Sequence, residues 1–110
     1  MDKISVEAKA RELAHAAAES SSGRAAETIF GGHDKRMRQT VIALREGSRL
    51  SEHESPSEAT LLVVSGRVRL ISGETTWHGR DWDFLIVPNA AHSVEADTDA
   101  VFVLTVSIGR

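Results

Sequence analysis

The spacing of apolar residues changes from a helical to a strand-like pattern early in the chain. In the first part, apolar side chains recur every three or four positions, at Val6, Ala10, Leu13 and Ala17. This spacing places them on one face of a helix, and the alanine content favours a helix. Ser5 can cap it, because its hydroxyl can accept a hydrogen bond from a free amide of the first turn. We therefore predict a helix from Ser5 to about Glu19, whose narrow apolar stripe docks on the β-rich body or on a second subunit.

Short β-type segments follow the helix. The segment 37–44 is rich in β-branched residues, and 60–66 is apolar almost throughout, as in a strand buried on both faces. The segment 67–71 alternates charged and apolar residues, as in a strand with one solvent-exposed face. Further strands are expected at 75–78, 83–88, 92–96 and 100–108. Short strands separated by turn signals about every eight to twelve residues are typical of a β-sandwich or barrel.

Length and composition restrict the class of protein. The 110 residues fit one domain, which we divide into an N-terminal helical arm (1–27) and a β-barrel body (28–110). The net charge of -3 lacks the basic surface that nucleic-acid binding requires. No apolar run is long enough to cross a bilayer, and the charged N-terminal segment does not resemble a signal peptide. We expect a cytoplasmic protein that binds neither nucleic acid nor membrane.

Two histidines in the β-type part are the main candidates for a functional site. His53 follows Gly47 by six residues and precedes a turn at Pro56, and His92 follows the apolar segment 83–88. Histidines carried by different strands can converge in a pocket that binds a metal or a small molecule. Strand alternation from the two histidines predicts an interior lined by His53, Ser55, Leu61, Val63, His92 and Val94.

Two further side chains are candidate pocket residues. Gln39 would orient a ligand with its amide if it faced the interior; otherwise it is an edge or dimer-facing residue. Trp77 and Trp82 flank the sequence HGRD, and either lines the mouth of the barrel or covers its end or an interface. The sequence has no Gly-x-Ser-x-Gly turn, no phosphate-binding glycine loop and no cysteine. We therefore predict no serine or cysteine nucleophile and no nucleotide site.

Residues 37–106 resemble the cupin superfamily, in particular the small single-domain cupins. The first cupin motif, with its spaced glycines and histidines, is matched in order and spacing by Gly47, His53 and Gly66. The second motif is matched by Asp83, Pro88 and His92. The strings GGH, RQTVIAL, EHESP, EAT and SGRVRL are also similar to a group of short cupins of unassigned role. The resemblance implies an all-β fold, an antiparallel jelly-roll barrel with a short N-terminal helix.

The chain departs from the cupin motifs at positions that bind metal. Ser55 replaces the second histidine of the first motif, and Ala59 replaces its glutamate. Glu58 lies one residue away, and a one-residue step along a strand turns a side chain to the opposite face. Glu58 therefore reaches the pocket only if the turn at Pro56 shifts the register. In the second motif, Trp82 replaces the glycine.

Three functions follow from the resemblance. The preferred one is a module that binds a small organic molecule in the barrel pocket, with a degenerate metal site. The alternative is a metal-dependent oxygenase, isomerase or decarboxylase, in which His53, His92 and Glu58 bind iron, manganese, zinc or nickel. The third is a regulatory or structural barrel filled by its own side chains.

The oligomeric state follows from the same resemblance. Small cupins are commonly dimers, and subunit pairing would cover exposed sheet edges. We therefore expect a homodimer, with the apolar segment AVFVLTV either in the core or at a two-fold interface.

Overall fold

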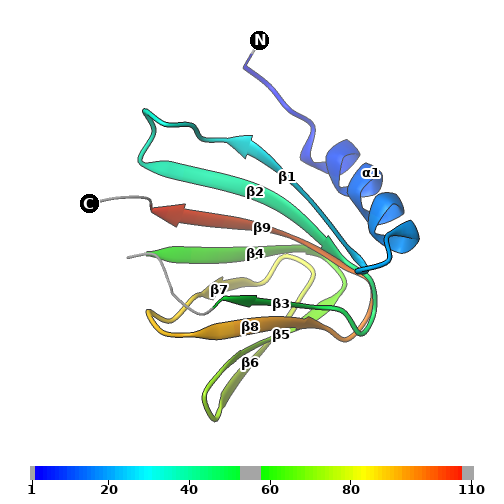
Figure 1. The fold of residues 1–110 in the computed structure, drawn as a ribbon, viewed down its shortest axis with the longest axis vertical. Coiled ribbons are helices and arrows are strands. Elements are labelled where there is room, and N and C mark those ends of the chain that lie inside the picture. Colours follow the sequence, from blue (N-terminus) through cyan, green and yellow to red (C-terminus); the bar gives the residue numbers. More distant parts are fainter. Residues whose placement is uncertain (1, 53–57, 108–110) are drawn as a thin grey trace.

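Two facing antiparallel β-sheets and one helix make up the fold of the computed structural model, which describes residues 2–52 and 58–107 (Figure 1). The described elements are α1 (Val6–Glu19), β1 (Arg24–Phe30), β2 (Met37–Leu44), β3 (Arg49–Glu52), β4 (Ala59–Ser65), β5 (Arg67–Ser72), β6 (Thr75–Arg80), β7 (Phe84–Ile86), β8 (His92–Ala96) and β9 (Ala100–Ser107). The strand order is β1-β2-β9-β4-β7 in the five-stranded sheet and β3-β8-β5-β6 in the four-stranded sheet.

The predicted N-terminal helix is confirmed. The hydroxyl of Ser5 accepts a 3.1 Å hydrogen bond from the amide of Ala8, so Ser5 is the N-cap. The helix buries Ala10, Leu13 and Ala17 against the outer face of the five-stranded sheet. Its stripe thus docks on the sheet of its own subunit. Within the described residues, no helix is long and apolar enough to cross a membrane.

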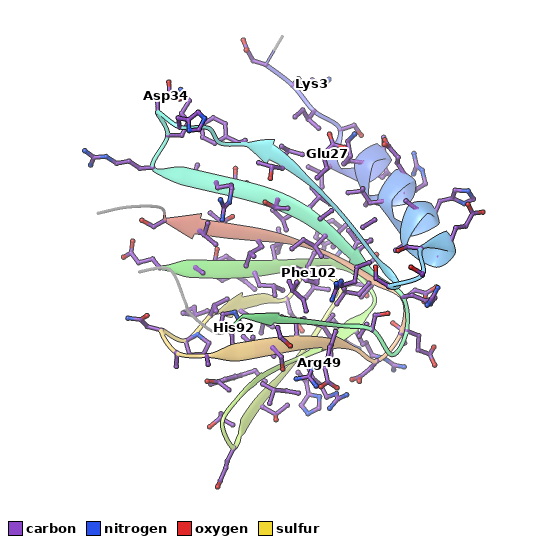
Figure 2. All side chains as sticks on the ribbon, in the orientation of Figure 1. Lys3, Glu27, Asp34, Arg49, His92 and Phe102 are labelled. Atoms are coloured by element: carbon purple, nitrogen blue, oxygen red, sulfur yellow. The ribbon has the colours of Figure 1, made fainter. Side chains whose placement is uncertain are left out.

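The space between the two sheets is filled by apolar side chains. Leu61, Val63 and Val94 are buried there, as strand alternation predicted. Phe102 is fully buried and projects from β9 into this space (Figure 2). Along β2, neighbouring residues are buried on opposite sides: Ile42 belongs to this core, whereas Val41 packs on the helix side. The five-stranded sheet therefore separates two cores.

The sequence predicted most strands, but two were missed. The expected segment 37–44 coincides with β2, and β5 has the expected solvent-exposed face. Strand β1 was not predicted because it is an edge strand whose side chains are mostly exposed and whose sequence shows no regular alternation of apolar and polar residues. The boundary expected at residue 27 falls inside β1. Strand β3 is only four residues long and carries no alternation that could identify it.

The expectation for β4 was wrong in one respect. We expected a strand buried on both faces, but burial alternates along β4. Ala59, Leu61 and Val63 are buried in the core, whereas Thr60 and Leu62 on the outer side are only partly buried. The apolar outer side of β4 is left incompletely covered because α1 packs on β1, β2 and β9 instead.

The expected architecture is confirmed as a mostly β fold with one short helix. A closed barrel is not confirmed, because among the described residues no strand ladder joins the two sheets. Gly66 forms the bend between β4 and β5 with φ +90°, and a Cβ there would lie 2.7 Å from the Cα of Ala100. This close approach of two backbones explains the glycine that the first motif contains.

Candidate functional site

His92 lies at one end of the sandwich, where β8 begins (Figure 2). Its strand partner is Glu52, the last residue of β3. His92 is two residues before Val94 and therefore points to the same inner side of the four-stranded sheet, where Val94 is buried. Unlike Val94, the imidazole is only partly buried. A polar ring thus stands at the end of an otherwise apolar interior.

One hydrogen bond determines the protonation pattern of the His92 ring. Nδ1 lies 3.0 Å from the carbonyl oxygen of Ala90. A carbonyl oxygen can only accept, so Nδ1 carries the hydrogen and donates it. In the neutral ring, Nε2 then has the free lone pair. His92 can therefore accept a hydrogen bond from a ligand or bind a metal through Nε2.

Apolar residues lie near this end of the interior. Ala59 and Val106 form a register pair between β4 and β9, and both are buried on the inner side. The carbonyl of Ala59 accepts a 3.0 Å hydrogen bond from the amide of Val87, which brings another buried apolar side chain beside it. Leu50 pairs with Val94 and packs on the same core. The surroundings suit the apolar part of a small organic molecule.

Two of the predicted pocket residues, His53 and Ser55, lie outside the described residues. The other residue of the expected metal set is Glu58, which is exposed. Ala59 occupies the inward position, so alternation turns Glu58 to the outer side of the sheet, away from His92. There Glu58 borders a shallow depression of about 310 Å³ together with Met37 and Thr105. The turn at Pro56, which would have to shift the register to bring Glu58 inward, lies outside the described residues.

The described residues do not fit a metal centre. In residues 2–52 and 58–107, no three histidine or carboxylate side chains come close enough to hold a metal ion. Catalytic zinc and non-haem iron sites commonly use three protein ligands. Of the described candidates, only His92 has a donor atom on the inner side.

Gln39 and Trp77 lie in different places. The amide of Gln39 donates a 3.1 Å hydrogen bond to the hydroxyl of Thr105, on the outer side of the five-stranded sheet. Gln39 therefore faces away from the interior that contains His92, and it lies on an internal strand, not at a sheet edge. Trp77 is on edge strand β6 and pairs with Leu70, which in turn pairs with Val94. Paired residues share a face, so Trp77 lies on the same side of its sheet as His92, with 38% of its surface exposed.

A groove on the outer face of the five-stranded sheet was not predicted. It has a volume of about 980 Å³ and lies between α1 and the strands. Its walls are mostly apolar, formed among others by Val6, Ala10, Ala14, Ile29, Leu62, Val64, Trp82, Phe84 and Val103. The sequence feature that could have indicated this groove is the segment 83–88, which is far more apolar than a short edge strand requires.

The outer face of the four-stranded sheet carries an ion-pair network. Arg69 contacts Asp97 at 2.7 Å and Glu95 at 2.9 Å, and Arg49 lies 3.6 Å from Glu95. The hydrogen bond to Asp97 is the main cause that raises the pKa of Arg69. The charges compensate one another at the surface, so we assign this network no role in a binding site.

Comparison with known proteins identifies the fold. No family model and no curated protein matches the sequence. A conserved protein of unknown function from Streptococcus pyogenes superposes with a TM-score of 0.71 at 18% identity, over 83% of this chain and 79% of that chain. A cupin superfamily protein from Desulfitobacterium hafniense gives 0.70 at 15% identity, over 78% of each chain. The Cupin_2 domain of an XRE family transcriptional regulator from Enterobacter cloacae gives 0.66 at 12% identity, over 79% of this chain and 98% of that domain.

These likenesses define a class: the chain has the fold of the small cupin domains. The cupin-type, mostly β fold that the two sequence motifs implied is thereby confirmed, whereas closure into a barrel is not. Identities this low establish the fold alone, and one fold carries many activities. The function must be argued from the side chains at the end of the sandwich.

Proposed function

We propose that the protein binds a small organic molecule at the end of the sandwich that contains His92, without turning it over. The hydrogen bond from Nδ1 to Ala90 carries this proposal, because it leaves Nε2 of the neutral ring as an acceptor. The matching ligand has a hydroxyl, an amide or a protonated carboxyl group, and an apolar part that packs near Leu50 and Val87. His53 and Ser55 are proposed to complete the pocket.

Binding without metal chemistry agrees with the donors available. Among the described residues, Glu58, the carboxylate of the expected ligand set, is on the outer side of the sheet and away from His92, whereas a metal-dependent enzyme of the expected type would need it on the inner side. One protein with the same fold is part of a transcriptional regulator. That setting is compatible with a domain that binds a molecule and does not transform it.

Nuclear magnetic resonance with simple probes tests the proposal. Benzyl alcohol and benzoic acid are titrated into isotope-labelled protein while backbone amide shifts are followed. We expect shifts in β8 and near Leu50, and about tenfold weaker binding in His92→Ala. The matched control is His78→Ala, which removes an exposed histidine from β6. Shifts that remain unchanged in His92→Ala would contradict the proposal.

Metal analysis tests the competing function. The purified wild type is assayed after growth with added iron, manganese, zinc and nickel. Stoichiometric metal in the wild type that is lost in His92→Ala but kept in His78→Ala would favour the metal-dependent enzyme. Under our proposal, the metal content of His92→Ala equals that of the wild type.

A further inference from the structure

A groove lies on the outer face of the five-stranded sheet, on the side away from His92. Helix α1 packs on β1, β2 and part of β9, so it forms one wall, and the outer sides of β9 and β4 form the floor (Figure 1). Trp82 and Phe84, beside β4, add aromatic surface to the lining. The volume of about 980 Å³ lies within the range of sites that bind small molecules.

An apolar row of side chains crosses the floor of this groove. Val41, Val103, Leu62 and Phe84 are successive register partners on β2, β9, β4 and β7, so their side chains share the outer side. Exposure rises along the row, from Val41, which is fully buried, to Phe84, which is 61% exposed. The far part of the row is therefore apolar surface that α1 does not cover.

A row of uncharged polar side chains lies at one end of the floor. Gln39, Thr105 and Thr60 are register partners two residues along their strands from the apolar row, so they face the same side. The amide of Gln39 donates its 3.1 Å hydrogen bond to the hydroxyl of Thr105. That hydroxyl keeps its own hydrogen to donate, and the hydroxyl of Thr60 can donate or accept. This end of the groove can therefore bind a polar head group.

The described walls of the groove carry no net charge. Among the lining residues, Glu7 and Arg11 are charged, and their side chains form an ion pair with each other at 3.2 Å. A charged head group at the polar row would lose its hydration without gaining an opposite charge. An uncharged head group is therefore favoured.

The backbone at Trp82 is a second, independent observation. Its φ is +72°, a left-handed conformation that favours glycine and is unusual for a bulky residue. In the described part of the chain, the indole makes no hydrogen bond, and Trp82 is 70% exposed. The turn would form at least as easily with glycine, so the fold gives no reason for tryptophan. An apolar molecule in the groove does, because the indole would cover it.

We propose that the groove is a second ligand site, which takes an uncharged amphiphile: an aliphatic chain with one hydroxyl or amide group. The head group binds at Thr60 and Thr105, and the chain runs parallel to β4 and β9 towards Trp82. Between Thr105 and Val101, which both line the groove, strand β9 rises about 13 Å. This length suits a medium-chain molecule such as octanol. The site lies on the opposite side of the sheet from the pocket at His92 and does not depend on it.

Titration with octanol and octanoate tests the proposal, because the two probes share a chain and differ in the charge of the head group. Each is added, below its solubility limit, to isotope-labelled full-length protein. Amide shifts are followed in α1, whose buried residues belong to the outer core and not to the core between the sheets. We expect saturable shifts at Ala10 and Ala14 with octanol, and about tenfold weaker binding of octanoate.

The same titration separates this site from the pocket at His92. His92→Ala should leave the α1 shifts unchanged, even if the proposed function of that pocket fails. Absence of α1 shifts with octanol overturns the inference of a groove site. Octanoate that binds as tightly as octanol, or more tightly, overturns the uncharged head group.

Two kinds of substitution test the placement of the chain and the head group. Ala14→Phe fills the groove from the helix wall and should abolish the α1 shifts. Ala16→Phe is the matched control, because Ala16 is exposed on the same helix and does not line the groove. Thr60→Val keeps the shape of the side chain but removes the hydroxyl, and should weaken octanol binding about tenfold. Equal binding by both phenylalanine variants, or undiminished binding by Thr60→Val, contradicts the placement.

Fluorescence reports on the far end of the chain. The protein has two tryptophans, so Trp77→Phe leaves Trp82 as the sole indole. Octanol should shift the emission of this variant to shorter wavelengths, because the exposed indole becomes covered. The shift should disappear when Ala14→Phe is added and persist with Ala16→Phe. Emission that octanol does not change in the Trp77→Phe variant overturns the proposed course of the chain.

Discussion

The backbone amide of Trp82 donates a 2.7 Å hydrogen bond to the carbonyl of Val63 on strand β4. The amide of Val63 donates a 2.9 Å hydrogen bond back to the carbonyl of Asp83. The turn before β7 is thus held on both sides of Trp82, and φ of Trp82 is fixed at +72°. Strand β4 imposes this conformation independently of the side chain that occupies the position.

Two substitutions at this position separate the backbone from the side chain. Trp82→Gly should change the free energy of unfolding by less than about 1 kcal/mol, because relief of left-handed strain offsets the flexibility that glycine adds to the unfolded chain. Trp82→Val keeps a branched Cβ in the same conformation and should be less stable than Trp82→Gly by about 1–2 kcal/mol. Urea denaturation is measured at a concentration low enough for monomers to prevail. A glycine variant less stable than the valine variant would show that strain is not the cause.

Two phenylalanines provide a matched test of the two sides of the five-stranded sheet. Phe102 is fully buried between the sheets, whereas Phe84 is 61% exposed on the outer side. Phe102→Ala should lower the free energy of unfolding by about 3–5 kcal/mol, because it leaves a cavity in a packed core. Phe84→Ala should cost less than about 1 kcal/mol in the monomer. Both are measured by urea denaturation, and similar losses would contradict the assignment of the core.

Local sequence patterns were sufficient for much of the fold. Strand alternation counted from the two histidines placed Leu61, Val63 and Val94 on the inner side, and all three are buried in the core. The helix followed from its stripe and its Ser5 cap. These features depend on neighbours in the chain, which is the information a sequence contains directly.

Features that depend on distant contacts could not be predicted in the same way. Gln39 could face either side of its strand, and the choice depended on where α1 docks. Trp82 stands at the glycine position of the second motif, and the turn there is held by hydrogen bonds with β4, which is distant in the sequence. The hydrogen bond between His92 and Ala90 is local in the sequence. Whether it leaves Nε2 as the acceptor depends on the orientation of the ring, which the sequence does not specify.

The contact between α1 and β1 should respond to alkaline pH. The ammonium of Lys9 lies 3.0 Å from Glu27 and 3.2 Å from Glu12, and the hydrogen bond to Glu27 is the main cause that raises the pKa of Lys9 (Figure 2 labels Glu27). A raised pKa in the folded state contributes stability that is complete below the unfolded value near 10.5 and is lost as pH rises through the folded value.

A comparison of the wild type with Lys9→Met measures this effect. The stability difference between them should be constant at neutral to mildly alkaline pH. It should then shrink as the pH rises past 10.5, because Lys9 of the wild type loses its charge. Denaturation by urea at a series of pH values gives the difference directly. A gap that stays constant up to pH values well above 10.5 would show that the ion pair does not stabilise the contact.

Gly66, in the bend that connects the two sheets, and Gly73, in the turn between β5 and β6, are a matched pair of glycines. Both have positive φ, +90° and +59°, so alanine is strained at either position. A Cβ at Gly66 would lie 2.7 Å from the Cα of Ala100, whereas nothing lies within 4 Å of a Cβ at Gly73. Gly73→Ala should therefore cost about 1 kcal/mol from backbone strain alone.

Gly66→Ala should cost about 3 kcal/mol or more, because its Cβ would overlap the carbonyl oxygen of Asp99 and the Cα of Ala100, so the two backbones must also move apart. The measurement is the midpoint of urea denaturation, with an unchanged slope as the sign that both variants still unfold in one step. Because the two variants share the same substitution and the same sign of φ, their difference reports mainly on the contact with the backbone of Asp99 and Ala100. Equal losses in the two variants would mean that this contact does not restrict the bend between β4 and β5.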